Sequence, residues 1–300
     1  MKDFLFFSGT SNLPLSQAVA VKLGVSLGNV EITRFMDNEC RVFVKDDVAG
    51  KEAFVVQSLS EVADQHLVEL CLLAAVLKDL KASHVTAIIP WLGYSKQDKA
   101  FRKGEAVSAQ LVAKFIETAG FDRVVTIELH SQNVLPFFHI PIIELSTETL
   151  LAGALKTNNC VVVSPDKGGK SRSERFAKHV QLPIVYIDKS RDLTTGAVSV
   201  TGISGSVGNR DVIIYDDIIN TGATAVKTSQ FLRDRGAKKI FFLATHAVFA
   251  GDAVSQLSKS TIDQVIVTDT IAIPKQKMFD KLQIVSVAPL VADAISSIVR

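Results

Sequence analysis

The segment from Val212 to Thr224 has the clearest chemical potential in this chain. An apolar run delivers two adjacent carboxylates, Asp216 and Asp217, and a loop of small residues follows, made of Asn220, Thr221, Gly222, Ala223 and Thr224. We expect a helix to begin at Ala225, so that backbone N–H groups of the loop attract an anion at the helix start. Small side chains would let a phosphate group come close, and the two acids suit ribose hydroxyls, either directly or through Mg²⁺. A capped helix preceded by turn acids is the structural alternative.

Two more polar clusters follow apolar runs in the second half. Asp166 comes shortly after Cys160–Val163, and Lys189 and Arg191 come shortly after Ile184–Ile187. Taken alone, Asp166 is compatible with a helix cap, and two cations in a loop indicate little. The small and polar residues 192–200 that follow them are typical of a mobile lid.

A fourth cluster, Glu128 and His130, lies at the end of the apolar run Val124–Leu129. Because side chains alternate along a strand, we expect these two to point to the same face. An isolated histidine at such a position is more often structural than a ligand.

Short apolar runs rich in β-branched residues recur along the chain and would position these clusters. Continuous apolar runs are typical of strands buried on both faces, as in a parallel sheet. They are Val85–Ile89, Val124–Leu129, Cys160–Val163, Ile184–Ile187, Val212–Tyr215, Ile240–Leu243, Val265–Val267 and Ile284–Val287. Helical patterns lie between them, at Leu67–Leu77, Val107–Glu117 and Ala225–Arg235. The alternation predicts an α/β fold, in which ligands bind beyond the carboxyl ends of the strands.

The composition fits a two-domain globular protein. The chain has 300 residues, of which 47% are hydrophobic, and a net charge of +2. That charge argues against a dedicated nucleic-acid binder. Three scattered cysteines, with no CxxC pair, argue against a cysteine-based zinc site and against a disulfide framework. The short apolar run near the N-terminus reads as a first strand, so we expect a cytoplasmic protein without a membrane segment.

The segment from Val212 to Thr224 resembles the ribose-phosphate binding loop shared by phosphoribosyltransferases and ribose-phosphate diphosphokinases. Five other segments resemble the diphosphokinase family, and the resemblance extends from Phe7 to Pro289. It implies two similar phosphoribosyltransferase-like (Rossmann-like) domains, each a mostly parallel sheet flanked by helices. The expected bounds are 1–145, rejoined by 286–300, for the ATP side and 146–285 for the ribose 5-phosphate side.

The resemblance also implies a role for each cluster. Lys189 and Arg191 would act on the transferring group, and His130 and Asp166 would bind Mg²⁺. The implied ATP-binding residues are Phe35, Asp37, Asn38, Glu39, Lys96, Gln97 and Asp98. The implied ribose 5-phosphate residues are Arg191, Asp216, Asp217, Asn220, Thr221, Gly222, Ala223 and Thr224.

Some positions depart from the family's pattern. Asn220 stands where an acid is usual, which removes one carboxylate beside the ribose. Lys96 replaces an arginine and lacks its planar, bidentate fork. Asn38 replaces a glycine, and asparagine tolerates the left-handed backbone that glycine would use. Glu128 replaces an aspartate, a conservative change.

The implied function is ribose-phosphate diphosphokinase activity, in which the β,γ-diphosphoryl group of MgATP moves to the 1-hydroxyl of ribose 5-phosphate. The products, 5-phosphoribosyl 1-diphosphate and AMP, would serve nucleotide biosynthesis. Because the family's Phe35 loop reaches a neighbouring subunit's adenine, we expect at least a dimer, and up to a hexamer. A phosphoribosyltransferase and a non-catalytic regulatory homologue remain the alternatives.

Overall fold

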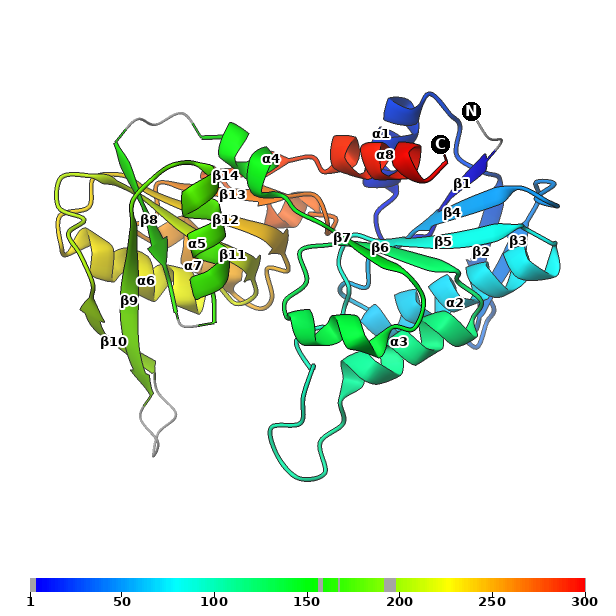
Figure 1. Cartoon of the computed structure of the whole chain (residues 1–300), viewed down its shortest axis with the longest axis horizontal. Helices are drawn as coiled ribbons and strands as arrows, with labels where there is room; N and C mark the ends of the chain where they lie inside the picture. The colour runs from blue at the N-terminus through cyan, green and yellow to red at the C-terminus, as the bar shows by residue number, and fades with distance from the viewer. Residues whose placement is uncertain (1–3, 156–158, 167, 192–197, 300) are drawn as a thin grey trace. The chain divides into compact units, whose positions relative to one another are not determined.

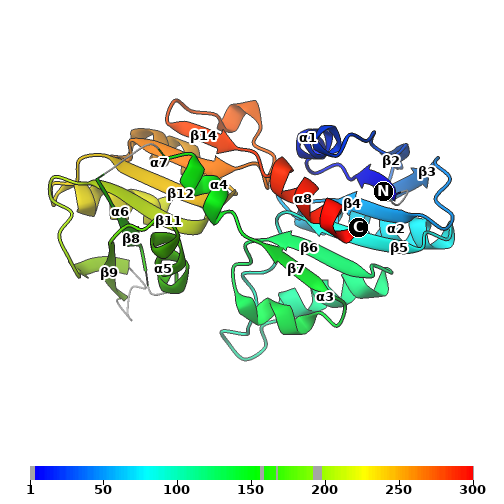
Figure 2. The same cartoon turned by 45° about the horizontal axis from the view of Figure 1, so that its top comes forward.

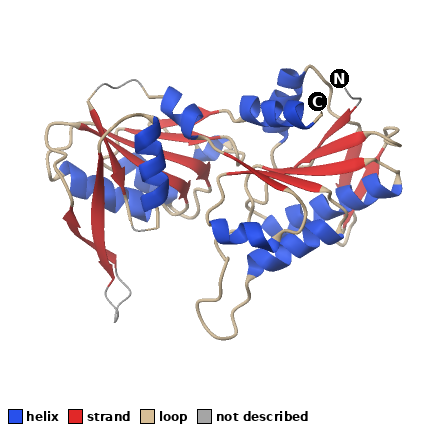
Figure 3. Cartoon of the chain, viewed as in Figure 1, coloured by secondary structure: helices blue, strands red, loops and turns tan. Residues whose placement is uncertain are grey.

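Two units, each built on its own sheet, make up the chain. Unit 1 contains residues 1–146, 270–272 and 286–300, and unit 2 contains residues 147–269 and 273–285. The computed structural model describes residues 4–155, 159–166, 168–191 and 198–299, and for residues 188–191 and 198–201 it describes the backbone alone. Each unit is an α/β arrangement of strands and helices (Figures 1 and 3).

Unit 1 has a parallel sheet in the order β1-β4-β5-β6-β7 and a separate antiparallel hairpin, β2-β3. Helices α2 and α3 cover one face of the sheet, and α1 and α8 lie side by side on the other (Figures 1 and 2). The strands are β1 Phe4–Ser8, β2 Val30–Arg34, β3 Cys40–Val44, β4 Glu52–Val56, β5 His84–Ile89, β6 Arg123–Ile127 and β7 Ile142–Leu145. The helices are α1 Leu13–Leu23, α2 Ala63–Asp79, α3 Ser108–Thr118, the 3₁₀ turn η1 Gln132–Phe137 and α8 Ala288–Ile298.

Unit 2 has a larger sheet in the order β10-β9-β8-β11-β12-β13-β14, parallel except for the β9-β10 pair. The strands are β8 Cys160–Ser164, β9 Ile184–Arg191, β10 Val198–Ile203, β11 Asp211–Ile219, β12 Ile240–Ala247, β13 Gln264–Thr268 and β14 Leu282–Val285. The helices are α4 Glu148–Gly153, α5 Lys170–His179, α6 Ala223–Arg233, α7 Ala253–Lys259 and the 3₁₀ turn η2 Lys275–Lys277. Both units therefore insert an antiparallel strand pair after their first strand and helix, and then continue in the same strand order.

Apolar strands bury side chains on both faces of the unit 2 sheet. Val161 and Val163 belong to the core beneath α6 and α7, whereas Val162 between them packs with α4 and α5. On β11, Ile214 packs in the core beneath α6 and α7, and Tyr215 packs in the core with α4 and α5. This two-sided burial is the reason that the strands read as unbroken apolar runs.

Strand ends differ from the sequence expectations at several places. β9 continues to Arg191 instead of ending at Ile187, because it pairs with β10 over that stretch. β14 covers 282–285 and not 284–287, and α6 begins two residues before Ala225, at Ala223.

The apolar run Val124–Leu129 predicts a strand up to Leu129, but β6 ends at Ile127. Glu128 then adopts a φ of +39°, which ends the alternation of side chains. The expectation that Glu128 and His130 share a face is therefore wrong: Glu128 is buried and His130 is exposed.

Candidate functional site

The acid pair lies within β11, which continues past the expected end at Tyr215 to Ile219, and it is held by an arginine from α5. Nη1 of Arg172 lies 3.2 Å from Oδ1 of Asp216 and 2.9 Å from Oδ1 of Asp217. The Asp217 side chain is almost fully buried, at 2% exposed, and that of Asp216 is 17% exposed. Asp216 is consequently the acid more accessible to a ligand.

Burial and the neighbouring carboxylate raise the pKa of Asp216 well above its usual value. The charge of Arg172 opposes that rise without cancelling it. Two acids that share one cation and a strongly shifted pKa are typical of a ligand site.

The loop after β11 opens α6 in the way that an anion site requires. Gly222 has a left-handed backbone, with φ of +77°, and immediately precedes the first helical residue. No side chain caps this helix start, and the loop residues other than Gly222 are exposed. Backbone N–H groups at an uncapped helix start, together with the helix dipole, favour a phosphate group.

Asp166 lies at the start of α5, on the same side as Asp216. Its Oδ1 accepts a 2.8 Å hydrogen bond from the N–H of Gly169, the residue that immediately precedes α5. A Cβ at position 169 would lie 3.6 Å from Oδ1 of Asp166 and 3.9 Å from Oδ1 of Asp216. The two carboxylates therefore flank the same small space, which glycine leaves open.

Lys189 and Arg191 belong to β9 and not to a loop after it. Their backbones pair with Val200 and Val198 of β10, while their side chains lie outside the described part of the chain. Most of the expected lid, residues 192–197, is also outside the described residues.

The segment expected to bind ATP follows β5 in unit 1 and is fixed to the start of α3. Ser108 Oγ donates a 2.7 Å hydrogen bond to Oε1 of Gln97, and the Gln97 carbonyl accepts from the Ala109 N–H. Tyr94 has a left-handed backbone, with φ of +65°, and its carbonyl accepts from the Gln97 N–H. Lys96 Nζ lies 6.0 Å from the centroid of the Trp91 ring.

Asp98 joins this segment to the residues that follow His130. The Asn133 amide donates a 2.9 Å hydrogen bond to Oδ2 of Asp98. Burial pushes the pKa of Asp98 upward, but hydrogen bonds from Ser131 and Asn133 outweigh it and lower the pKa below its usual value. The structure thus brings two of the expected segments together at the carboxyl ends of β5 and β6.

The remaining ATP residues lie at the tip of the β2-β3 hairpin, where Phe35, Asp37 and Glu39 are all exposed. Asn38 has a φ of +70°, which confirms the left-handed backbone expected there. Its carbonyl accepts from Arg34, and the Phe35 N–H donates to the Glu39 carbonyl. Within the described residues, no hydrogen bond or ion pair joins this hairpin to the segment around Gln97.

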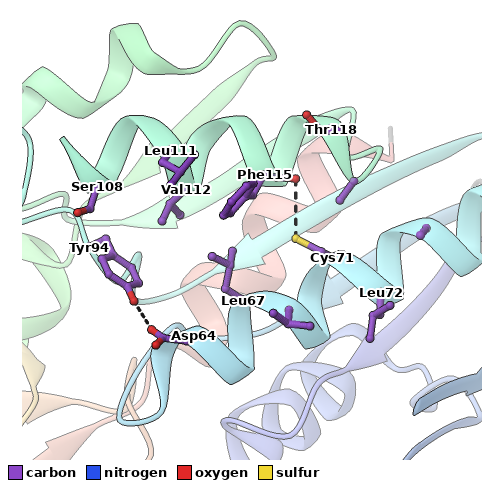
Figure 4. Close-up of a pocket in the computed structure, with 13 residues that line it drawn as sticks. Asp64, Leu67, Cys71, Leu72, Tyr94, Ser108, Leu111, Val112, Phe115 and Thr118 are labelled. Atoms are coloured by element: carbon purple, nitrogen blue, oxygen red, sulfur yellow. Dashed lines mark hydrogen bonds between the residues drawn. The ribbon is translucent and has the colours of Figure 1, made fainter. Parts of the chain in front are cut away.

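An apolar groove of about 650 Å³ runs between α2 and α3 in unit 1 (Figure 4). Its walls include Leu67, Val112 and Phe115, and the hydrogen-bonded side chains of Tyr94 and Asp64 stand at one end. Such a lining does not suit a triphosphate, so we do not place the nucleotide in it.

His130 and Asp166, the expected metal pair, belong to different units. Among the residues that the structure describes, no three His, Cys, Asp or Glu side chains gather as a metal cluster.

None of the described helices combines the length and the apolar character needed to cross a membrane.

Arg172 and Asn133 are site residues that the sequence did not reveal. Arg172 lies 44 residues before Asp216. The one signal for it was the general rule that a buried acid pair needs a nearby cation, which does not say where in the sequence that cation lies. Asn133 carried no such signal.

Comparison with known proteins assigns the family. Residues 4–120 match the N-terminal domain of ribose phosphate pyrophosphokinase, and residues 194–300 match the phosphoribosyl synthetase-associated domain. A ribose-phosphate pyrophosphokinase of Bacillus caldolyticus is 36% identical over 97% of this chain and 93% of its own length. The chain belongs to the ribose-phosphate pyrophosphokinase family.

Other members of the family agree in sequence and in structure. A protein of Lactiplantibacillus plantarum named putative ribose-phosphate pyrophosphokinase 2 is 39% identical over 96% of this chain and 91% of its own. The crystal structure of phosphoribosylpyrophosphate synthetase from Mycobacterium smegmatis matches with a TM-score of 0.93, 34% identity and 99% coverage of both chains. The family and the fold of two phosphoribosyltransferase-like units are confirmed, and the catalytic interpretation is favoured over a phosphoribosyltransferase or a regulatory homologue.

Proposed function

We propose that this chain transfers the β,γ-diphosphoryl group of ATP to the 1-hydroxyl of ribose 5-phosphate. The products are 5-phosphoribosyl 1-diphosphate and AMP. The observation that carries the proposal is the combination, in unit 2, of the two acids in the last half of β11 with the uncapped start of α6. The family's named activity supports the same conclusion.

Ribose 5-phosphate binds to unit 2 in this proposal. Its phosphate accepts hydrogen bonds from backbone N–H groups of residues 220–224 and from the hydroxyls of Thr221 and Thr224. The sugar hydroxyls donate to Asp216, whose partial exposure suits that task. Asp217 supports this subsite from a buried position.

ATP binds to unit 1, with its phosphates near Lys96, Gln97 and Asp98. The hydrogen bonds to Ser108 and Asn133 hold this segment in shape before the nucleotide arrives. The exposed hairpin residues Phe35, Asp37, Asn38 and Glu39 contact the adenine bound to a neighbouring subunit, so the active form is at least a dimer. Sedimentation of the active enzyme as a monomer would contradict this part.

Mg²⁺ is the expected metal, and the donor set fits it. Mg²⁺ commonly binds one or two carboxylates together with substrate phosphates and water, and Asp166 borders an open space beside Asp216. His130 and Asp166 are the residues we assign to it. Bound there, the ion would neutralise phosphate charge.

Catalysis rests on positioning and on fixed positive charge, because phosphoryl transfer spreads negative charge over the transferring oxygens. Lys189 and Arg191 stabilise that charge.

The polar substrates and the lack of a spanning helix among the described residues agree with a role in the cytoplasm.

The test is AMP release from purified protein given ATP, MgCl₂ and ribose 5-phosphate. AMP that forms only when the sugar phosphate is present supports the proposal. Tight binding of both substrates without AMP would support a regulatory homologue instead. Consumption of added 5-phosphoribosyl 1-diphosphate together with a free nucleobase would support a phosphoribosyltransferase.

A further inference from the structure

Arg172 is the one cation within ion-pair distance of both acids among the described residues of unit 2. It is only 11% exposed. Removing a cation this far from water costs desolvation free energy unless fixed partners compensate for it. The buried position of Arg172 therefore indicates that the two acids are held in a defined geometry around it.

Packing fixes α5 against β11 next to the acids. The Phe176 ring stacks on Tyr215 with centroids 4.1 Å apart and planes 10° apart. Ser173 Oγ donates to the Tyr215 carbonyl at 3.3 Å. Ser173 directly follows Arg172 in α5, and Tyr215 directly precedes Asp216 in β11. The contacts of these neighbours hold α5 on β11 and so limit the movement of the Arg172 guanidinium.

Two hydrogen bonds fix the carboxylate of Asp216 at its Oδ1 atom. Oδ1 accepts from Nη1 of Arg172 and from the N–H of Asp217 at 2.9 Å. The same nitrogen of Arg172 reaches Asp217, which ties the two carboxylates to each other.

We propose that Arg172 is a positioning residue for the sugar: it clamps Asp216 and Asp217 through a single nitrogen and thereby holds Asp216 in the orientation that binds the ribose hydroxyls. This inference rests on the placement of ribose 5-phosphate in unit 2. Without the clamp, two adjacent carboxylates repel each other and Asp216 turns away from its binding orientation.

The experiment compares three variants in steady-state kinetics with ATP and ribose 5-phosphate varied separately. Arg172→Gln removes the charge, and Arg172→Lys keeps it on a shorter point-charge donor. Arg175→Gln is the matched control, because Arg175 lies on the same helix, is 57% exposed and pairs with Glu148, away from the acids.

We expect Arg172→Gln to raise the KM for ribose 5-phosphate by about tenfold or more, as loss of a charged hydrogen-bond partner does. The KM for ATP should stay within about twofold, because the ion pairs of Arg172 go to Asp216 and Asp217 and not to residues that we assign to ATP. Arg172→Lys should fall between wild type and Arg172→Gln, and Arg175→Gln should match wild type.

A folded Arg172→Gln variant with an unchanged KM for ribose 5-phosphate would overturn the proposal, as would equal increases in both KM values. If Arg172→Gln does not fold, Arg172→Lys decides: a KM for ribose 5-phosphate equal to that of wild type overturns the proposal, and a selective rise supports it. Wild-type AMP release tests the proposed function separately, so the two failures are distinguishable.

Discussion

Substituting Gly222 by alanine tests whether the loop before α6 is shaped for a ligand. The left-handed backbone at this position, with φ of +77°, costs a residue with a Cβ about 1–2 kcal/mol. The new Cβ would also lie 3.3 Å from Cγ of Leu257, which must then shift by a few tenths of an ångström. Together these effects amount to about 2 kcal/mol.

The loop can relieve this strain by moving, because its other residues are exposed. Movement displaces the N–H groups that we assign to the sugar phosphate. We therefore expect Gly222→Ala to lower the free energy of unfolding by about 1–2 kcal/mol in urea titrations. We expect the KM for ribose 5-phosphate to rise about tenfold, which corresponds to about 1.4 kcal/mol of lost binding.

Gly236 offers a matched control near the opposite end of α6. Its φ is +82°, and an added Cβ would meet only the Gly208 Cα, at 3.6 Å. Gly236→Ala should thus lose about 1–2 kcal/mol of stability without a change in the KM for ribose 5-phosphate. The same KM in both variants would refute the assignment of the loop to the phosphate.

Three further changes separate the other parts of the account. Lys189→Ala should keep its circular dichroism spectrum and lose on the order of 10²–10³ in turnover, and near-normal turnover would remove its catalytic role. Asp216→Asn should lose activity yet gain about 1 kcal/mol of stability at pH 7. The pKa of Asp216 is raised in the folded state, so the folded wild-type protein binds a proton more tightly there than the unfolded chain does. The stability of the wild type therefore falls as pH rises from about 4 toward that raised pKa, and Asp216→Asn should flatten this fall. Asn133→Ala should raise the KM for ATP several-fold and spare that for ribose 5-phosphate, through loss of the bond to Asp98.

The sheet elements could be predicted because burial on both faces imposes an apolar side chain at nearly every strand position. Cys160–Val163 and Val212–Tyr215 lie within β8 and β11 for this reason. The apolar pattern predicts too short a β9, because the polar end of this strand, up to Arg191, pairs with β10 near the sheet edge.

The site was predictable where chemistry depends on local sequence, and not where it depends on contacts between distant segments. The loop before α6 combines small residues and hydroxyls next to one another, so its pattern is visible. Arg172 reaches the acids only through the packing of α5 on β11. Glu128 gave no sign of its positive φ, because glutamate rarely adopts that backbone.

The most direct test of the central claim follows an oxygen atom. Ribose 5-phosphate carrying ¹⁸O at the 1-hydroxyl is converted with MgATP, and the products are examined by ³¹P NMR and mass spectrometry. Attack of that hydroxyl on the β-phosphorus predicts ¹⁸O in the bridge between C1 and the diphosphate, with unlabelled AMP formed in equal amount. Label found in AMP, or ADP formed in place of AMP, would contradict the proposed transfer.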